Sequence, residues 1–152
     1  MKEKILEAFA RLGFKLEDAD GIGYVFDYEG KRFLYLYNED DEDFMSIALP
    51  NFYDYEEDKA AVFCALSDKL NSSLKYVKVY AIGGSLWLFY ERELFGGEDL
   101  EALIRSMILH LEAGLMMAAR QSEEIEKSFA EGKDADEDDA DSAETDETDD
   151  DA

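Results

Sequence analysis

The chain has 152 residues, 47% of them apolar, and a formal net charge of -24. This length and apolar share suffice for one domain that buries a core without disulfides or metals. Residues 133–152 contain twelve acidic residues and one lysine, which leaves a net charge of -13 on residues 1–132. Because both parts repel phosphate groups and anionic lipids, direct binding to nucleic acid or to a membrane is disfavoured.

The first elements predicted are a helix and a hairpin. Residues 2–12 place Ile5, Phe9 and Leu12 on one helical face, and Gly13 suits the left-handed conformation that ends many helices. Residues 22–28 and 31–37 then read as two strands joined by the two-residue turn Glu29-Gly30. Such a short turn fixes which residues stand opposite each other in the two strands.

The first hairpin is predicted to carry aromatic residues on one face and aliphatic residues on the other, because alternate side chains of a strand point to opposite faces. The predicted pairs are Phe26 with Phe33 and Tyr24 with Tyr35 on the aromatic face, and Val25 with Leu34 and Gly23 with Leu36 on the aliphatic face.

A third strand, residues 43–49, and a second helix follow. Pro50 is expected to stop the strand, and Asp54 with Glu57 has the spacing of a capping box at the start of the helix. Cys64 lies in the apolar run of this helix and is expected to be a small buried residue.

A second hairpin is predicted from residues 75–82 and 85–91, with Gly83-Gly84 as its turn. The same counting places Val79 opposite Leu88 and Ala81 opposite Leu86, with Tyr80 opposite Trp87 and Lys78 opposite Phe89 on the reverse face. We therefore expect this hairpin, too, to have one aliphatic and one aromatic face.

A third helix starts after Gly96-Gly97, with Leu100, Leu103, Met107 and Leu111 at helical spacing. Beyond Gly132 the chain has no aromatic residue and almost no aliphatic bulk, so it cannot offset the entropy of ordering. We predict a single domain, residues 1–132, and a disordered acidic tail, residues 133–152.

The predicted fold class is α+β: a helix, three antiparallel strands, a helix, a β-hairpin and a long C-terminal helix. We expect the aliphatic face of the sheet to pack on the helices, with Val25, Leu34, Leu36, Ile47, Val79, Leu86 and Leu88 inside. The aromatic face is then predicted to bind a partner through Tyr24, Phe26, Phe33, Tyr35, Tyr80, Trp87 and Phe89. A helix or a second copy of the chain could instead cover that face permanently.

Short patterns reinforce this element order, namely Leu70-Asn71 at a helix end, Leu74-Lys75-Tyr76 before a strand, and Leu86-Trp87-Leu88 in the return strand. Together they resemble the type III secretion chaperone-like fold, in particular its YbjN-type branch. The resemblance implies a non-enzymatic, commonly dimeric domain that binds other polypeptides. We therefore expect a protein-binding or chaperone-like adaptor, homodimeric, that holds hydrophobic segments of a protein partner.

The sequence shows no motif for catalysis, a cofactor or a metal. His110 is the only histidine, and the acidic loop at residues 38–43 lacks the glycine and spacing of an EF-hand. The single cysteine fits a reducing compartment, and the longest apolar run, residues 60–66, is too short to span a membrane, so a cytoplasmic location is expected. Two alternatives stay open: an enzyme whose site is assembled from scattered carboxylates, and a purely structural self-assembling subunit.

Overall fold

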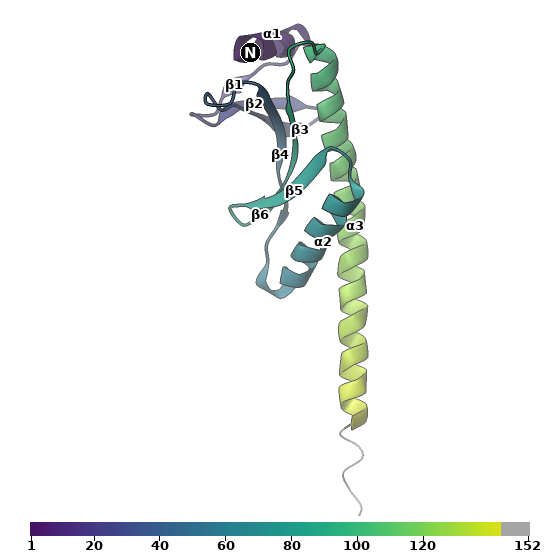
Figure 1. The fold of residues 1–152 in the computed structure, drawn as a ribbon. Helices are drawn as coiled ribbons and strands as arrows, with labels where there is room; N and C mark the ends of the chain where they lie inside the picture. The colour runs from purple at the N-terminus through teal and green to yellow at the C-terminus, as the bar shows by residue number, and fades with distance from the viewer. Residues whose placement is uncertain (144–152) are drawn as a thin grey trace, which may run out of the picture.

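The computed structural model describes the backbone of residues 1–143 and the side chains of residues 1–134 and 136. An antiparallel sheet and three α-helices form an α+β domain, which confirms the predicted fold class (Figure 1). The elements in chain order are α1 (Lys2–Arg11), β1 (Glu17–Asp18), β2 (Gly23–Tyr28), β3 (Lys31–Leu36), β4 (Phe44–Asp54), the 3-10 turn η1 (Glu57–Lys59), α2 (Ala60–Ser73), β5 (Val77–Ile82), β6 (Ser85–Glu93) and α3 (Leu100–Ala143).

The six strands lie in the order β1-β2-β3-β4-β6-β5, so the two hairpins occupy opposite ends of the sheet. Within each hairpin the predicted pairing is confirmed, for example Phe26 with Phe33 and Val79 with Leu88. The long strand β4 joins the hairpins by pairing with β3 on one side and with β6 on the other.

The prediction that the aromatic residues of both hairpins share one face is wrong. Across the middle of the sheet, Tyr35 pairs with Ile47, which pairs with Tyr90, which in turn pairs with Val77. Directly paired residues lie on the same face. The aromatic face of the β2–β3 hairpin is therefore continuous with the aliphatic face of the β5–β6 hairpin.

This mixed face is the one that packs on the helices. The ring of Phe9 in α1 lies 5.0 Å from that of Phe26 and 5.6 Å from that of Tyr35, and Phe26 stacks on Phe33 at 5.4 Å. Other buried helix residues of the same core are Ile5, Ala8, Leu66, Leu70, Ile104, Met107, Leu111 and Ala118. The rings of Phe9, Phe26, Phe33 and Tyr35 thus form the part of the core beneath α1.

The predicted set of inner residues is accordingly half right. Ile47, Val79, Leu86 and Leu88 are buried in the core as expected. Val25, Leu34 and Leu36 instead lie half-buried on the other face, since each of them alternates with a core residue of its own strand.

The helix α3 runs along the sheet and continues beyond it (Figure 1). At Gly114 the helix lies close to the sheet: a Cβ there would be in van der Waals contact with methyl groups of Leu74, at 3.4 Å, and Leu88, at 3.6 Å. Further along, the Tyr53 hydroxyl of β4 donates a 2.8 Å hydrogen bond to Glu126.

The segment Leu100–Asp134 is long and apolar enough to cross a membrane, with a mean hydropathy of 1.4 in its most apolar window. The core helix of a globular domain meets the same criterion, and α3 buries Ile104, Met107 and Leu111 in the core. The structure continues α3 to Ala143, whereas the sequence predicted a tail from residue 133; residues 144–152 of that predicted tail lie outside the described residues.

Three local predictions differ from the structure. The strand β4 does not end at Pro50 but continues to Asp54 through a register shift between Leu49 and Tyr53. Helix α2 begins at Ala60 after η1, without a side-chain cap. Cys64 is exposed rather than buried, because it lies on the side of α2 opposite Val62, Leu66 and Leu70.

The side chain of Asn71, near the end of α2, forms hydrogen bonds with the backbone at the middle of the edge strand β5. Its side-chain amide donates to the carbonyl oxygen of Val79 at 2.9 Å, and its carbonyl oxygen accepts from the Val79 N–H at 2.7 Å. Both outward backbone groups of Val79 are therefore satisfied without a neighbouring strand.

Candidate docking surface

The face of the sheet opposite the helices, which we call the open face, carries a mostly apolar set of side chains. From β2 to β5 these are Val25, Leu34, Leu36, Ser46, Ala48, Phe89, Glu91, Trp87, Tyr80, Lys78 and Ile82. Because alternate residues of these strands build the core, the positions of the open face are fixed by the same register.

Three rings stand in a row at the β5–β6 end of the open face. Tyr80 and Phe89 stack with centroids 4.1 Å apart and planes 3° apart, and Trp87 lies 6.0 Å from Phe89 at 15°. The indole N–H of Trp87 donates a 3.0 Å hydrogen bond to the Asn51 side chain. Asn51 lies in the irregular part of β4 with a positive φ of 55°, so the bend in β4 positions the acceptor that orients Trp87.

A charged pair borders this aromatic row. Lys78 forms an ion pair with Glu91, and its ammonium group lies 5.4 Å from the centroid of the Tyr80 ring. The hydrogen bond to Glu91 raises the pKa of Lys78. Glu91 also accepts a 3.2 Å hydrogen bond from Ser46, so the polar groups here are satisfied within the sheet.

The middle of the open face is apolar and continuous. Leu34 pairs with Ala48, which pairs with Phe89, and so a strip of apolar side chains crosses β3, β4 and β6. Ala48 and Phe89 are each 0% exposed although no helix lies over them in the described part of the chain. Their neighbours on adjacent strands cover them, and the accessible parts of the strip are Leu34, Tyr80 and Trp87.

The predicted partner-binding residues fall into three groups. Tyr80, Trp87 and Phe89 lie on the open face, where Phe89 stacks with both other rings and is 0% exposed, so that only Tyr80 and Trp87 are accessible to a partner. Phe26, Phe33 and Tyr35 are core residues, 1%, 0% and 1% exposed, and a partner cannot reach them in this structure. Tyr24 is half-buried on the helix side of the sheet.

The residues that sequence reasoning missed are the aliphatic ones, Val25, Leu34 and Leu36. The alternation of the first hairpin had already grouped them on one face. What was missing was the register of β3 against β4, which determines the face that turns away from the helices.

The side chains described, those of residues 1–134 and 136, include no cluster of three or more histidine, cysteine, aspartate or glutamate residues that could hold a metal ion. Glu98 accepts hydrogen bonds from the N–H groups of Phe95 at 2.6 Å and Gly96 at 3.0 Å, and these bonds lower its pKa. A lowered pKa stabilises the carboxylate, whereas a general acid needs the opposite shift.

The fold has counterparts among solved structures. The crystal structure of YbjN from E. coli, described as a candidate transcription regulator, matches with a TM-score of 0.58 over 79% of this chain and 92% of that chain. The chain has a YbjN-like fold. An uncharacterized protein from Methanothermobacter thermautotrophicus matches the YbjN-like domain with a TM-score of 0.52 over 84% and 98% of the two chains. The identities are 10% and 17%, so the likeness concerns the fold alone. No protein-family model and no curated protein matches the sequence.

Proposed function

We propose that this YbjN-like domain is a non-enzymatic adaptor, chaperone-like in its action, whose open face holds a hydrophobic segment of a partner polypeptide. The observation that supports it most directly is the accessible apolar side chains of Leu34, Tyr80 and Trp87, which lie on a sheet face that no helix of the described residues covers. Apolar surface of this kind is typical of interaction sites, and aromatic anchors contribute much of the binding energy.

The charge of the chain favours a partner segment with basic flanks. With a net charge of -13 on residues 1–132 and -24 on the whole chain, the protein attracts cationic polypeptides and repels nucleic acid. A regulatory role, which the description of the E. coli structure names for that protein, would therefore operate here through contact with another protein rather than with DNA.

We also propose that the adaptor is a cytoplasmic homodimer. Exposed apolar side chains on α3, Leu109 at 56% and Met116 at 73%, offer a second surface that two copies could share. Such a dimer would leave the open face free for a partner. A purely structural subunit would instead use the open face for self-assembly, and its mass would not fall on dilution.

Capture from native cytoplasmic extract, followed by titration of the purified partner, tests the adaptor proposal. We expect Leu34→Ser and Trp87→Ser each to weaken capture of the same protein, while Phe95→Ser serves as the control because it removes an exposed ring between β6 and α3, outside the open face and the proposed dimer surface. Trp87 emission should also change when the partner is added to the unmodified domain. Equal capture by all variants together with unchanged emission would exclude the open face as the binding surface.

A further inference from the structure

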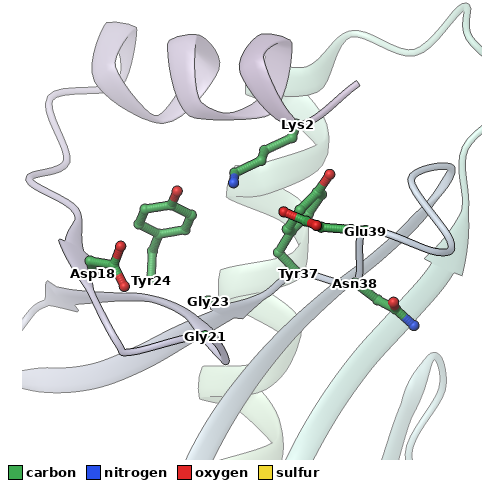
Figure 2. A pocket seen from close by; sticks show the side chains of 8 residues that line it. All are labelled: Lys2, Asp18, Gly21, Gly23, Tyr24, Tyr37, Asn38 and Glu39. Atoms are coloured by element: carbon green, nitrogen blue, oxygen red, sulfur yellow. The ribbon is translucent and has the colours of Figure 1, made fainter.

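A pocket of about 510 Å³ lies between the start of α1 and the outer end of the sheet, away from the open face. Its lining residues are Lys2, Asp18, Gly21, Gly23, Tyr24, Tyr37, Asn38 and Glu39. The volume falls within the range of small-molecule sites, roughly 300 to 1,000 Å³. Figure 2 shows Lys2 reaching from α1 into the space between Tyr24 and Tyr37, with Asp18 on the Tyr24 side and Glu39 beside Tyr37.

The ammonium group of Lys2 contacts aromatic rings rather than carboxylates. Its Nζ lies 4.4 Å from the ring centroid of Tyr37 and 5.7 Å from that of Tyr24. Both distances are within the reach of a cation–π interaction, about 6 Å. The neighbouring Tyr24 hydroxyl raises the pKa of Lys2.

Both rings are held in place by contacts outside the pocket. Tyr24 stacks on the buried ring of Tyr35 at 6.1 Å with 14° between the planes. The Tyr37 hydroxyl donates a 3.2 Å hydrogen bond to Glu42. Each ring thus has a contact that does not involve Lys2.

The backbone and the charges around the rings also suit a cation. At Gly23, which lines the pocket, a Cβ would lie 2.0 Å from the carbonyl oxygen of Tyr35, so the close approach of β2 to β3 requires glycine there. In the described part of the chain, neither Asp18 nor Glu39 forms an ion pair. Two carboxylates at the rim therefore remain available to a positive charge that enters the pocket.

We propose that this pocket binds an organic ammonium group, which takes the place of Lys2 between the rings of Tyr24 and Tyr37. Aromatic faces combined with nearby carboxylates are the chemistry that recognises alkylated ammonium groups. Lys2 is an internal competitor: it occupies the site when no ligand is present, and its charge repels a second cation. The ligand is either a small amine or the side chain of an amine-bearing residue on another protein.

Choline chloride is the first probe, titrated at constant ionic strength and followed by calorimetry and by the NMR signals of the Tyr24 and Tyr37 rings. We expect Lys2→Ala to bind choline about threefold to tenfold more tightly than the unmodified chain, because the competitor is removed. Lys4→Ala is the matched control: it removes the same charge from the exposed side of α1 and should leave the affinity unchanged. Equal affinities of the Lys2→Ala and Lys4→Ala variants would overturn the proposal.

Two further comparisons identify the interaction and the source of the ligand. In the Lys2→Ala background, Tyr37→Phe should keep choline binding and Tyr37→Leu should lose it, with circular dichroism to confirm that both variants fold. The neutral isostere 3,3-dimethylbutanol should not bind; ring shifts as large as those with choline would refute recognition of charge. A trimethyllysine peptide that binds more tightly than choline identifies a protein side chain, and the reverse order identifies a small amine.

Discussion

Replacing two adjacent residues of β3, Phe33 and Leu34, tests the assignment of the two faces of the sheet. Phe33 is 0% exposed and stacks on Phe26 in the core beneath α1, whereas Leu34 is half-buried on the open face. Truncation of a buried phenylalanine to alanine costs about 3 to 5 kcal/mol of unfolding free energy, and a half-buried leucine should cost about 1 to 2 kcal/mol. Phe33→Ala should therefore be much more destabilising than Leu34→Ala.

Urea unfolding followed by circular dichroism gives the comparison directly. With an m-value of about 2 kcal/mol/M, Phe33→Ala should lower the urea midpoint by about 1.5 to 2.5 M, and Leu34→Ala by about 0.5 to 1 M. If Phe33→Ala does not fold, Phe33→Leu is compared with Leu34→Val in the same way. A greater loss at Leu34 than at Phe33 would show that the aliphatic face is the inner one and that the assignment is reversed.

Three further substitutions test contacts elsewhere in the domain. Asn71→Ala removes both hydrogen bonds to Val79 and should lower the unfolding free energy by about 1 to 3 kcal/mol, with faster amide exchange at Val79. Asn71→Asp keeps the bond from the Val79 N–H and should lower the unfolding free energy less. Equal stability of the two variants and the unmodified protein would refute this role of Asn71. The pKa of Glu98 in the folded protein lies below its ordinary value of 4.5. The ionised carboxylate therefore stabilises the folded protein above pH 4.5, and this stabilisation is lost as the pH falls through the folded pKa. Glu98→Gln should therefore flatten the acid limb of the melting temperature plotted against pH, and an unaltered limb would contradict the assignment. Burial and the hydrogen bond to Glu126 raise the pKa of Tyr53 to about 12. The neutral Tyr53 hydroxyl therefore contributes its full share of the folding stability below pH 10, and this stability is lost between pH 10 and about 12. Tyr53→Phe should cost about 1 kcal/mol at pH 7 yet reduce the loss of stability in that alkaline range, measured by urea unfolding at each pH.

Apart from the two-residue strand β1, which the sequence did not predict, the order of the elements and the pairing within each hairpin were predictable because local signals determine them. The Glu29-Gly30 turn adopts positive φ at both residues, 47° and 75°, and this geometry alone sets the partners of the first hairpin. The Gly83-Gly84 turn acts in the same way in the second. Neither prediction required knowledge of the rest of the chain.

The identity of the inner face was not predictable from alternation, because a strand with apolar side chains on both faces has no local signal for the side that meets a helix. Here the inner face is determined by contacts between segments that are distant in sequence, such as Phe9 with Tyr35 and Tyr35 with Ile47. The pocket between α1 and the sheet escaped prediction for a similar reason. Lys2 and Tyr37 are far apart in sequence, and only the packing of α1 on the sheet brings them together.

The hydrogen bonds from Asn71 to Val79 also restrict how another chain could join this sheet. A peptide that extends a sheet by β-augmentation must pair with the free backbone groups of an edge strand. At the centre of β5 those groups are already taken, so an added strand would first have to displace the amide of Asn71. A partner segment that binds at this end of the domain should therefore contact it through side chains rather than through main-chain hydrogen bonds. The selectivity of binding should then depend on the shape and polarity of those side chains.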